Sequence, residues 1–79
     1  MKATMISEEK FSPKGATKYP CVYTLSEYPV KNGMWYRVEY FADLSGTPYH
    51  RFKNYRSKVE AEKEYTAEVN LEMWRQEKV

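Results

Sequence analysis

An Asn-Gly dipeptide between two aromatic-rich runs limits what this chain can fold into more than any other feature. Asn32-Gly33 lies within residues 28–41, and Asn-Gly is strongly preferred in the type I′ turns of β-hairpins, where both central residues need positive φ. After this turn the side chains alternate between two faces, with Met34, Tyr36, Val38 and Tyr40 on one and Trp35, Arg37, Glu39 and Phe41 on the other. Large aromatics on both faces are unusual for a strand that buries only one side. The sequence therefore predicts a hairpin with a core face and a second face that needs an explanation.

Length and composition indicate one small cytoplasmic domain. The chain has 79 residues, of which 42% are apolar and 30% are charged, so it can bury a small core. No apolar run approaches the roughly 20 residues of a membrane helix, and the first residues lack the apolar segment of a secretory signal. Cys21 is the single cysteine, which excludes an intrachain disulfide and fits a reducing compartment. We expect the many aromatic residues to supply the core.

The turn and breaker residues predict an α+β fold in two parts. Residues 1–18 are polar, are interrupted by Ser12-Pro13-Lys14-Gly15, and are expected to form a mobile arm. Residues 19–79 are expected to form a single domain, in which a three-stranded antiparallel meander at 19–28, 34–42 and 47–55 is covered on one face by a helix at 58–76. Ser57 begins that helix with an S-x-x-E capping box.

Two registers compete at the turn after the second strand. A two-residue loop would place Val38 opposite Arg51 and bury a charge. A three-residue loop with Gly46 in a left-handed bulge buries apolar against apolar and sets opposite charges side by side, so we prefer it. It pairs Val38 with Phe52, Glu39 with Arg51 and Arg37 with Lys53. This register places Tyr49, Arg51 and Lys53 beside Trp35, Arg37 and Phe41 on the outer face of the sheet.

The helix carries two apolar rows. Residues at intervals of four form a stripe for packing on the sheet, namely Ala61, Tyr65, Val69 and Met73. Glu60, Glu64 and Glu68 form a solvated face. A second, shorter row of Ala67, Leu71 and Trp74 is left for the N-terminal arm, a second subunit or a partner protein. Leu71 and Trp74 are therefore a candidate second interface, and we expect a monomer or a weak dimer.

The sequence offers no catalytic or metal-binding set of residues. His50 is the single histidine and is predicted on the strand face of Phe52 and Val38, where we interpret it as a half-buried structural residue. Cys21 has no partner at CxxC spacing, and the sequence contains no Gly-rich phosphate loop. We expect a protein that is not an enzyme and that uses no cofactor and no metal.

The outer sheet face is the candidate working surface. Its predicted binding residues combine aromatics with cations: Trp35, Arg37, Phe41, Tyr49, Arg51, Lys53 and Arg56. Residues 31–58 hold six basic and two acidic residues, whereas residues 59–79 hold three basic and six acidic ones, so the sheet is basic and the helix acidic. Such a face suits nucleic acid, and it also has the composition of a protein-interface hot spot. A third interpretation is that the N-terminal arm covers it.

Two resemblances bear on this choice. The order of three strands and a helix, with Trp35-x-Arg37 on the middle strand, resembles the AP2-type and integrase amino-terminal DNA-binding domains. That resemblance implies DNA contact through Trp35, Arg37, Arg51 and Lys53. A compact, cofactor-free domain with polarised charge is also similar to small phage-encoded inhibitors of host defence enzymes. Within that group, Ile6-Ser7-Glu8 matches the apolar-x-Glu tripeptide after which the injected internal head proteins of T-even phages are cut.

We therefore expect a non-enzymatic binding protein of the phage or mobile-element anti-defence type. It would inhibit or modulate a host protein, one that handles nucleic acid or presents an acidic surface, through its basic and aromatic sheet face. The alternative is a DNA- or RNA-binding domain that uses the same face, either without sequence preference or by reading shape. In both cases we expect action in the cytoplasm of the host cell and no membrane contact.

Overall fold

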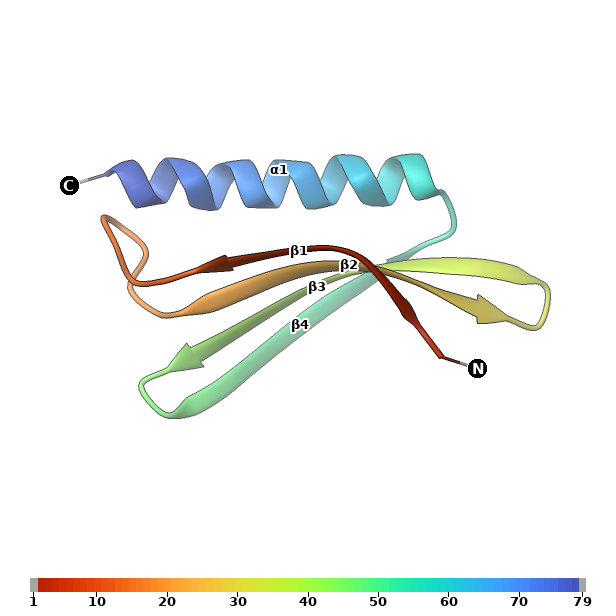
Figure 1. Ribbon diagram of the computed structural model, residues 1–79, viewed down its shortest axis with the longest axis horizontal. Coiled ribbons are helices and arrows are strands. Elements are labelled where there is room, and N and C mark those ends of the chain that lie inside the picture. Colours follow the sequence, from red (N-terminus) through yellow and green to blue (C-terminus); the bar gives the residue numbers. More distant parts are fainter. Residues whose placement is uncertain (1, 79) are drawn as a thin grey trace.

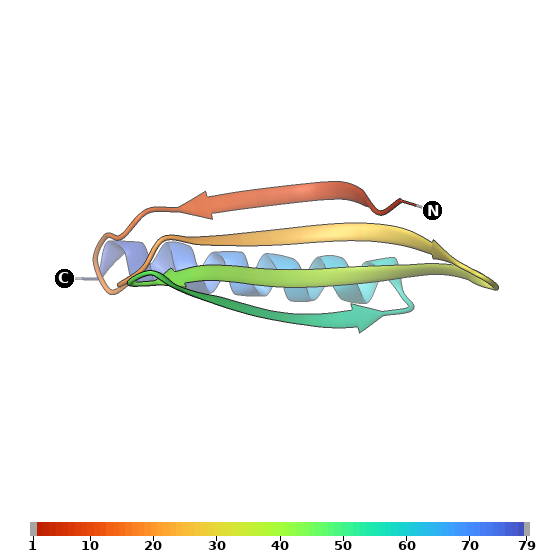
Figure 2. The same cartoon turned by 90° about the horizontal axis from the view of Figure 1, so that it is seen from below.

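One four-stranded antiparallel sheet and one C-terminal helix make up the computed structural model, which describes residues 2–78. The elements are β1 (Thr4–Phe11), β2 (Cys21–Val30), β3 (Gly33–Leu44), β4 (Thr47–Tyr55) and α1 (Lys58–Glu77). The strand order is β1-β2-β3-β4, so every strand pairs with its neighbours in the chain. Helix α1 lies along one face of the sheet (Figure 1), and the view from below shows the strands in front of the helix (Figure 2). The predicted α+β class with a C-terminal helix is confirmed.

The segment predicted to be a polar arm contains the fourth strand, so the expectation of three strands was wrong. β1 pairs antiparallel with β2, with a bulge between Met5 and Ser7. As an edge strand, β1 carries the charged residues Glu8, Glu9 and Lys10, which discourage pairing with other chains. The same charges hide the alternation of apolar and polar residues by which a strand is recognised in a sequence.

The predicted hairpin between β2 and β3 is present, but its turn lies one residue earlier than Asn32-Gly33. Val30 pairs with Gly33, which leaves Lys31 and Asn32 as the turn. Among residues 2–78, Ser45 is the one non-glycine residue with positive φ, so Asn32 does not adopt the left-handed conformation that a type I′ turn requires. The paired part of the hairpin is therefore longer than predicted.

The turn between β3 and β4 sets a register that differs from both predicted ones. Leu44 pairs with Thr47, so the turn consists of Ser45 and Gly46, whose φ angles are 56° and 94°. Two positive φ values in a two-residue loop match the twist of the flanking strands, and Asp43 Oδ1 accepts a hydrogen bond from the Gly46 N–H at 2.7 Å. The resulting pairs are Val38 with Lys53, Glu39 with Phe52, Tyr40 with Arg51 and Arg37 with Asn54. The preferred register was wrong by one position, so every β4 side chain lies on the face opposite to the one expected.

The core lies between α1 and the central strands. Its buried apolar residues are Cys21, Tyr23, Leu25, Val38, Ala42, Ala61, Tyr65 and Val69. Ser57 caps the helix as predicted, since its Oγ accepts a hydrogen bond from the Glu60 N–H at 3.3 Å. The predicted helix stripe is confirmed in its first three members, but Met73 is 53% exposed and Glu72 is buried in its place.

A buried carboxylate connects the loop between β1 and β2 to the end of the helix. Glu72 is 3% exposed and accepts hydrogen bonds from the Thr17 hydroxyl, from the Tyr23 hydroxyl at 2.8 Å and from Arg75 Nη1 at 3.1 Å. Burial opposes the ionisation of this carboxyl, but the three donors outweigh that effect and hold its pKa below the usual range. Glu72 is therefore a charged member of the core, and its partners come from the loop, from β2 and from α1.

The backbone of the same loop also contacts the helix. The Ala16 N–H donates to the Arg75 carbonyl at 2.8 Å, and Gln76 Nε2 donates to the Ser12 carbonyl at 2.8 Å. Gly15 lies so close to the end of α1 that a Cβ at this position would overlap the carbonyl oxygens of the last helical residues. Figure 1 shows this loop (orange) beside the C-terminal end of α1.

Replacement of Glu72 tests this connection. We expect Glu72→Ala to lower the free energy of unfolding by about 3 kcal/mol, because it leaves buried donors unpaired and opens a cavity. Because folding lowers the pKa of Glu72, its contribution is complete above its ordinary pKa of 4.5 and is lost as the pH falls through the lower, folded-state pKa. Urea unfolding of both proteins between neutral and acidic pH should therefore show a difference that shrinks in acid.

The exposed residue Glu62 on the same helix provides the control. Glu62→Ala is expected to change the free energy of unfolding by less than about 0.5 kcal/mol at neutral pH. Equal losses for the two variants, or a Glu72→Ala loss that grows in acid, would contradict a structural role for the ionised carboxylate.

Candidate functional site

The face of the sheet opposite α1 has no helix over it, and the observed register determines which side chains it presents. We call this surface the outer face. Paired residues of neighbouring strands lie on the same face, so its members follow from the three strand pairings. They are Met5, Glu8 and Lys10 of β1, Val22, Thr24, Ser26, Tyr28 and Val30 of β2, Trp35, Arg37, Glu39, Phe41 and Asp43 of β3, Pro48, His50, Phe52 and Asn54 of β4, and the adjoining Arg56. In Figure 2 the strands lie in front of the helix.

The seven predicted binding residues are divided between the two sides of the sheet. Trp35, Arg37, Phe41 and Arg56 lie on the outer face, whereas Tyr49, Arg51 and Lys53 lie on the helix-facing side. Arg51 Nη2 is 3.0 Å from Glu68 Oε1, and the Arg51 guanidinium lies 4.7 Å from the centre of the Tyr40 ring. The expectation that all seven share one face was wrong because it depended on the shifted register. The basic residues Arg51 and Lys53 of β4 instead face the acidic helix, so the positive charge of the strand and the negative charge of the helix partly offset each other.

The register brings four residues to the outer face that were not predicted to work there, namely Tyr28, His50, Phe52 and Asn54. His50 was expected beside Val38 as a half-buried structural residue. Instead, its Nε2 lies 2.8 Å from Glu39 Oε2, and its side chain is 42% exposed. A two-residue turn at Ser45-Gly46 is the sequence signal that would have placed the three β4 residues correctly, whereas the face of Tyr28 follows from the alternation of side chains along β2.

Arg37, Phe41, His50 and Phe52 form what we call the stacked cluster. The Phe41 and His50 rings are parallel within 7° and their centroids are 4.5 Å apart, while the Phe52 ring lies 5.5 Å from His50 at an interplanar angle of 27°. The Arg37 guanidinium lies 4.2 Å from the centre of the Phe52 ring. The rings contact their neighbours and still face solvent, since Phe41 is 40% exposed and Phe52 is 52% exposed.

Hydrogen bonds fix the position of Arg37. Its Nε donates to Asn54 Oδ1 at 2.8 Å, its Nη2 donates to the Tyr28 hydroxyl at 3.2 Å, and that hydroxyl donates to the same Asn54 oxygen at 2.9 Å. Toward the same end of the face, the Arg56 guanidinium lies 4.8 Å from the centre of the Trp35 ring. Arg37 is thus held in place before a partner arrives, which reduces the entropy lost on binding.

The charges of the outer face are balanced. Its three basic residues are Lys10, Arg37 and Arg56, and its three acidic residues are Glu8, Glu39 and Asp43. The strongly basic surface predicted from the sequence required Arg51 and Lys53, which lie on the other side of the sheet. The outer face is therefore aromatic, with ordered cations, rather than strongly basic.

Burial shifts the pKa values of the Cys21 thiol and the Tyr23 hydroxyl in the core. The Cys21 thiol is buried, and burial together with the Glu72 charge raises its pKa to about 11, so it stays protonated at neutral pH. Burial and the hydrogen bond to Glu72 also raise the pKa of Tyr23. Within residues 2–78, no group of three or more His, Cys, Asp and Glu residues is arranged to hold a metal ion. In the same part of the chain, no helix combines the length and the apolar character needed to cross a membrane.

Leu71 and Trp74, the candidate second interface, are exposed on α1. Their exposed fractions are 47% and 53%, and Lys78 Nζ lies 4.1 Å from the centre of the Trp74 ring. The N-terminal segment that was expected to cover either this row or the outer face is instead β1, at the edge of the sheet. The interpretations in which this segment covers the row or the outer face are therefore wrong, and the alternatives of a second subunit or a partner remain for the row.

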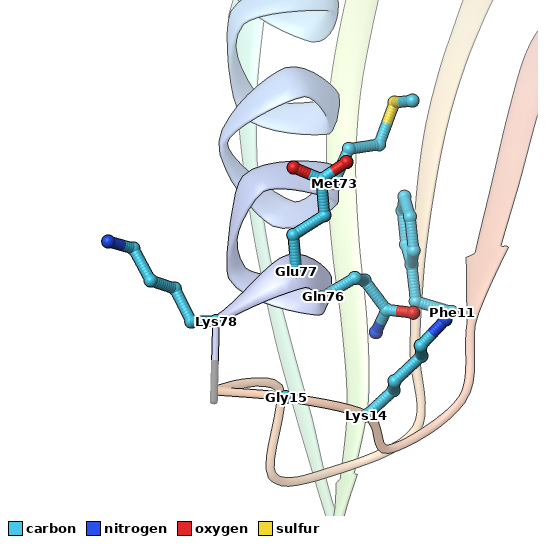
Figure 3. Close-up of a pocket in the computed structure, with 7 residues that line it drawn as sticks. All are labelled: Phe11, Lys14, Gly15, Met73, Gln76, Glu77 and Lys78. Atoms are coloured by element: carbon cyan, nitrogen blue, oxygen red, sulfur yellow. The ribbon is translucent and has the colours of Figure 1, made fainter.

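A cleft of about 700 Å³ lies at the C-terminal end of α1. Figure 3 shows Phe11 and Lys14 on one side of it and Met73 and Glu77 of the helix on the other. Gln76 also lines this cleft, and its side-chain amide is already bonded to the Ser12 carbonyl. The cleft therefore belongs to the contact between loop and helix described above.

No protein-family model, no curated protein and no solved structure matches this chain.

A charge swap tests the division of residues between the two faces. We expect Arg51→Glu to lower the free energy of unfolding by about 1 kcal/mol, because it places a third carboxylate near Glu64 and Glu68 of the helix. Adding Glu68→Arg should restore much of this loss in urea unfolding. The matched control adds Glu39→Arg instead, which would restore stability only in the register that pairs residues 39 and 51. Rescue by Glu39→Arg and not by Glu68→Arg would contradict the assignment of faces.

Proposed function

We propose that this chain is a non-enzymatic binding protein that docks on another protein through its outer face. The stacked cluster is the observation that supports this proposal. It combines exposed aromatic rings with an arginine whose position is fixed, which is the composition of protein-interface hot spots. A four-stranded sheet supported by a helix on its far side gives that cluster a rigid base.

Two features favour a protein partner over nucleic acid. Single-stranded nucleic acid binds by stacking successive bases on a row of exposed ring faces, but His50 stacks on Phe41 and on Phe52, and Arg37 lies over Phe52, so the cluster offers one ring face of Phe41 rather than a row of them. Nucleic acid also requires an excess of cations, and the outer face has as many acidic as basic residues. A protein surface needs neither free ring faces nor a net positive charge.

We propose further that the bound protein is inhibited or modulated, as in the phage-encoded inhibitors that the sequence resembles. A small rigid domain can act in this way by covering the working surface of a larger partner. In this form of the proposal the partner is a host protein, and the protein acts in the host cytoplasm. Leu71 and Trp74 are then available for a second contact within the same assembly.

Variants on the two sides of the sheet test the docking face. The tagged protein is used to capture its partner from a lysate, and the affinity of the purified pair is then measured by calorimetry. We expect Phe52→Ala and Arg37→Glu each to weaken binding by about 30-fold or more, as the loss of a hot-spot residue does. Lys53→Glu provides the matched control, since Lys53 is an exposed cation of the same strand that faces the helix side, and it should change affinity by less than about threefold.

The opposite pattern, with binding lost in Lys53→Glu and kept in Phe52→Ala and Arg37→Glu, would show that the docking face is wrong. Circular dichroism and thermal unfolding of each variant separate a lost contact from a lost fold.

The second candidate function is direct binding of DNA or RNA. It is favoured by one observation, the Arg56 guanidinium over the Trp35 ring, beside the turn that carries Lys31. Gel-shift titration with single-stranded and duplex DNA at two salt concentrations distinguishes the candidates. Under the protein-docking proposal we expect no complex at low salt. A complex whose affinity falls steeply as salt is raised would support nucleic-acid binding instead.

A further inference from the structure

A hollow at one end of the outer face has the lining of a binding site for a single side chain. It has a volume of about 390 Å³ and lies where β1 ends, β2 begins and β3 approaches its turn. Lys10, Val22 and Phe41 are successive partners across three strands, and Asp43 N–H donates to the Pro20 carbonyl at 3.1 Å in the next row. The hollow is therefore part of the outer face and adjoins the stacked cluster through Phe41.

We propose that this hollow binds one aromatic side chain from a peptide segment of the partner protein. The inference rests on the proposed function, because it names the anchor by which the partner is held on the outer face. Protein interfaces concentrate their binding energy where an aromatic anchor fills a pocket near such a cluster. The chemistry of the lining and the orientation of Phe41 each point to this occupant.

The lining is apolar, with one cation and one carboxylate among its members. Pro20, Val22 and Phe41 supply the apolar surface. The row between them, Phe11, Cys21 and Ala42, also lines the hollow, although its side chains lie on the helix-facing side. Lys10 is 71% exposed at its side chain, and its ammonium is 3.9 Å from the nearest Glu8 oxygen, so it can still bind a carbonyl oxygen. Asp43 uses Oδ1 to accept from the Gly46 N–H, which leaves Oδ2 for a further N–H. A donor and an acceptor near an apolar hollow complement the amide groups on both sides of a peptide side chain.

The orientation of Phe41 favours an aromatic occupant over an aliphatic one. One face of its ring is stacked on His50 of β4, and β4 lies on the opposite side of β3 from β2. The other face of the ring is therefore turned toward β2, where Val22 and the hollow are located. An aromatic ring inserted there would continue the stack that already joins Phe41 to His50 and Phe52.

The probe for this site is N-acetylphenylalaninamide, which carries one aromatic ring between two amides. We would titrate it into the ¹⁵N-labelled full chain and follow the backbone amide shifts. We expect saturable shifts at Val22, Phe41 and Asp43, with a Kd on the order of 1 mM, as is usual for a ligand of this size. N-acetylglycinamide, which has the same amides and no ring, should produce no saturable shifts at the same concentrations.

Two variants of β2 make the test specific. Val22→Asp places a carboxylate in the hollow and should weaken the probe by about tenfold or more. Val30→Asp makes the same change on the same face at the other end of the strand, and it should leave the affinity within about twofold. The shift map of the wild-type protein gives the location without any variant, so a Val22→Asp protein that fails to fold does not prevent the test.

Absence of saturable shifts at about 20 mM probe, far above the expected Kd, would overturn the inference. Shifts confined to Met73, Gln76 and the other residues of the helix-end cleft would also overturn it, because they would place the ring elsewhere. The result is independent of the docking-face test. Probe binding at the hollow with no loss of partner affinity in Phe52→Ala would refute the proposed function and leave the hollow as a site. Loss of partner affinity in Phe52→Ala without probe binding would support the docking face and overturn the hollow as a site.

Discussion

Two consecutive residues with positive φ, Ser45 and Gly46, decide which side chains of β4 face the helix and which face solvent. Side chains alternate along a strand, so a slip of one residue at this turn would exchange the two sets completely. With the observed turn, His50 and Phe52 join Arg37 and Phe41 in the stacked cluster, and Arg51 and Lys53 lie toward α1. The candidate site exists because of this turn.

On the helix side of the sheet, charged residues of α1 form contacts with the sheet and with the loop between β1 and β2. Arg51 pairs with Glu68, and Glu72 binds the loop between β1 and β2 through buried hydrogen bonds. Part of the contrast between a basic sheet and an acidic helix is therefore used within the protein, in the contact of Arg51 with Glu68. What is left for a partner is the opposite face, where aromatic rings contact two arginines and where three basic residues are balanced by three acidic ones.

Much of the fold could be predicted from local signals. The Ser57 capping box, the helix after it and the strands on both sides of residues 31–33 depend on neighbours in the sequence, and they were predicted to within a few residues. β1 could not be recognised, because an exposed edge strand with Glu8, Glu9 and Lys10 has little apolar alternation. Only the β3 part of the candidate site could be predicted, because Trp35, Arg37 and Phe41 follow from the alternation of side chains along β3. The β4 residues beside them depend on which residues of Asp43-Leu44-Ser45-Gly46 form the turn. Several turns satisfy that sequence locally, and tertiary pairing selects one.

The strand register determines the outer face, and the outer face carries both the proposed docking function and the hollow for an aromatic anchor. The outer face, the stacked cluster and the hollow all depend on the strand register, so the register most needs a direct measurement. A two-dimensional NOE spectrum of the free protein provides one. We expect cross-peaks between the ring protons of Phe41 and His50 and between those of Tyr40 and the side chain of Arg51. Cross-peaks from Glu39 to Arg51 and from Val38 to the Phe52 ring, without those to His50, would contradict the observed register.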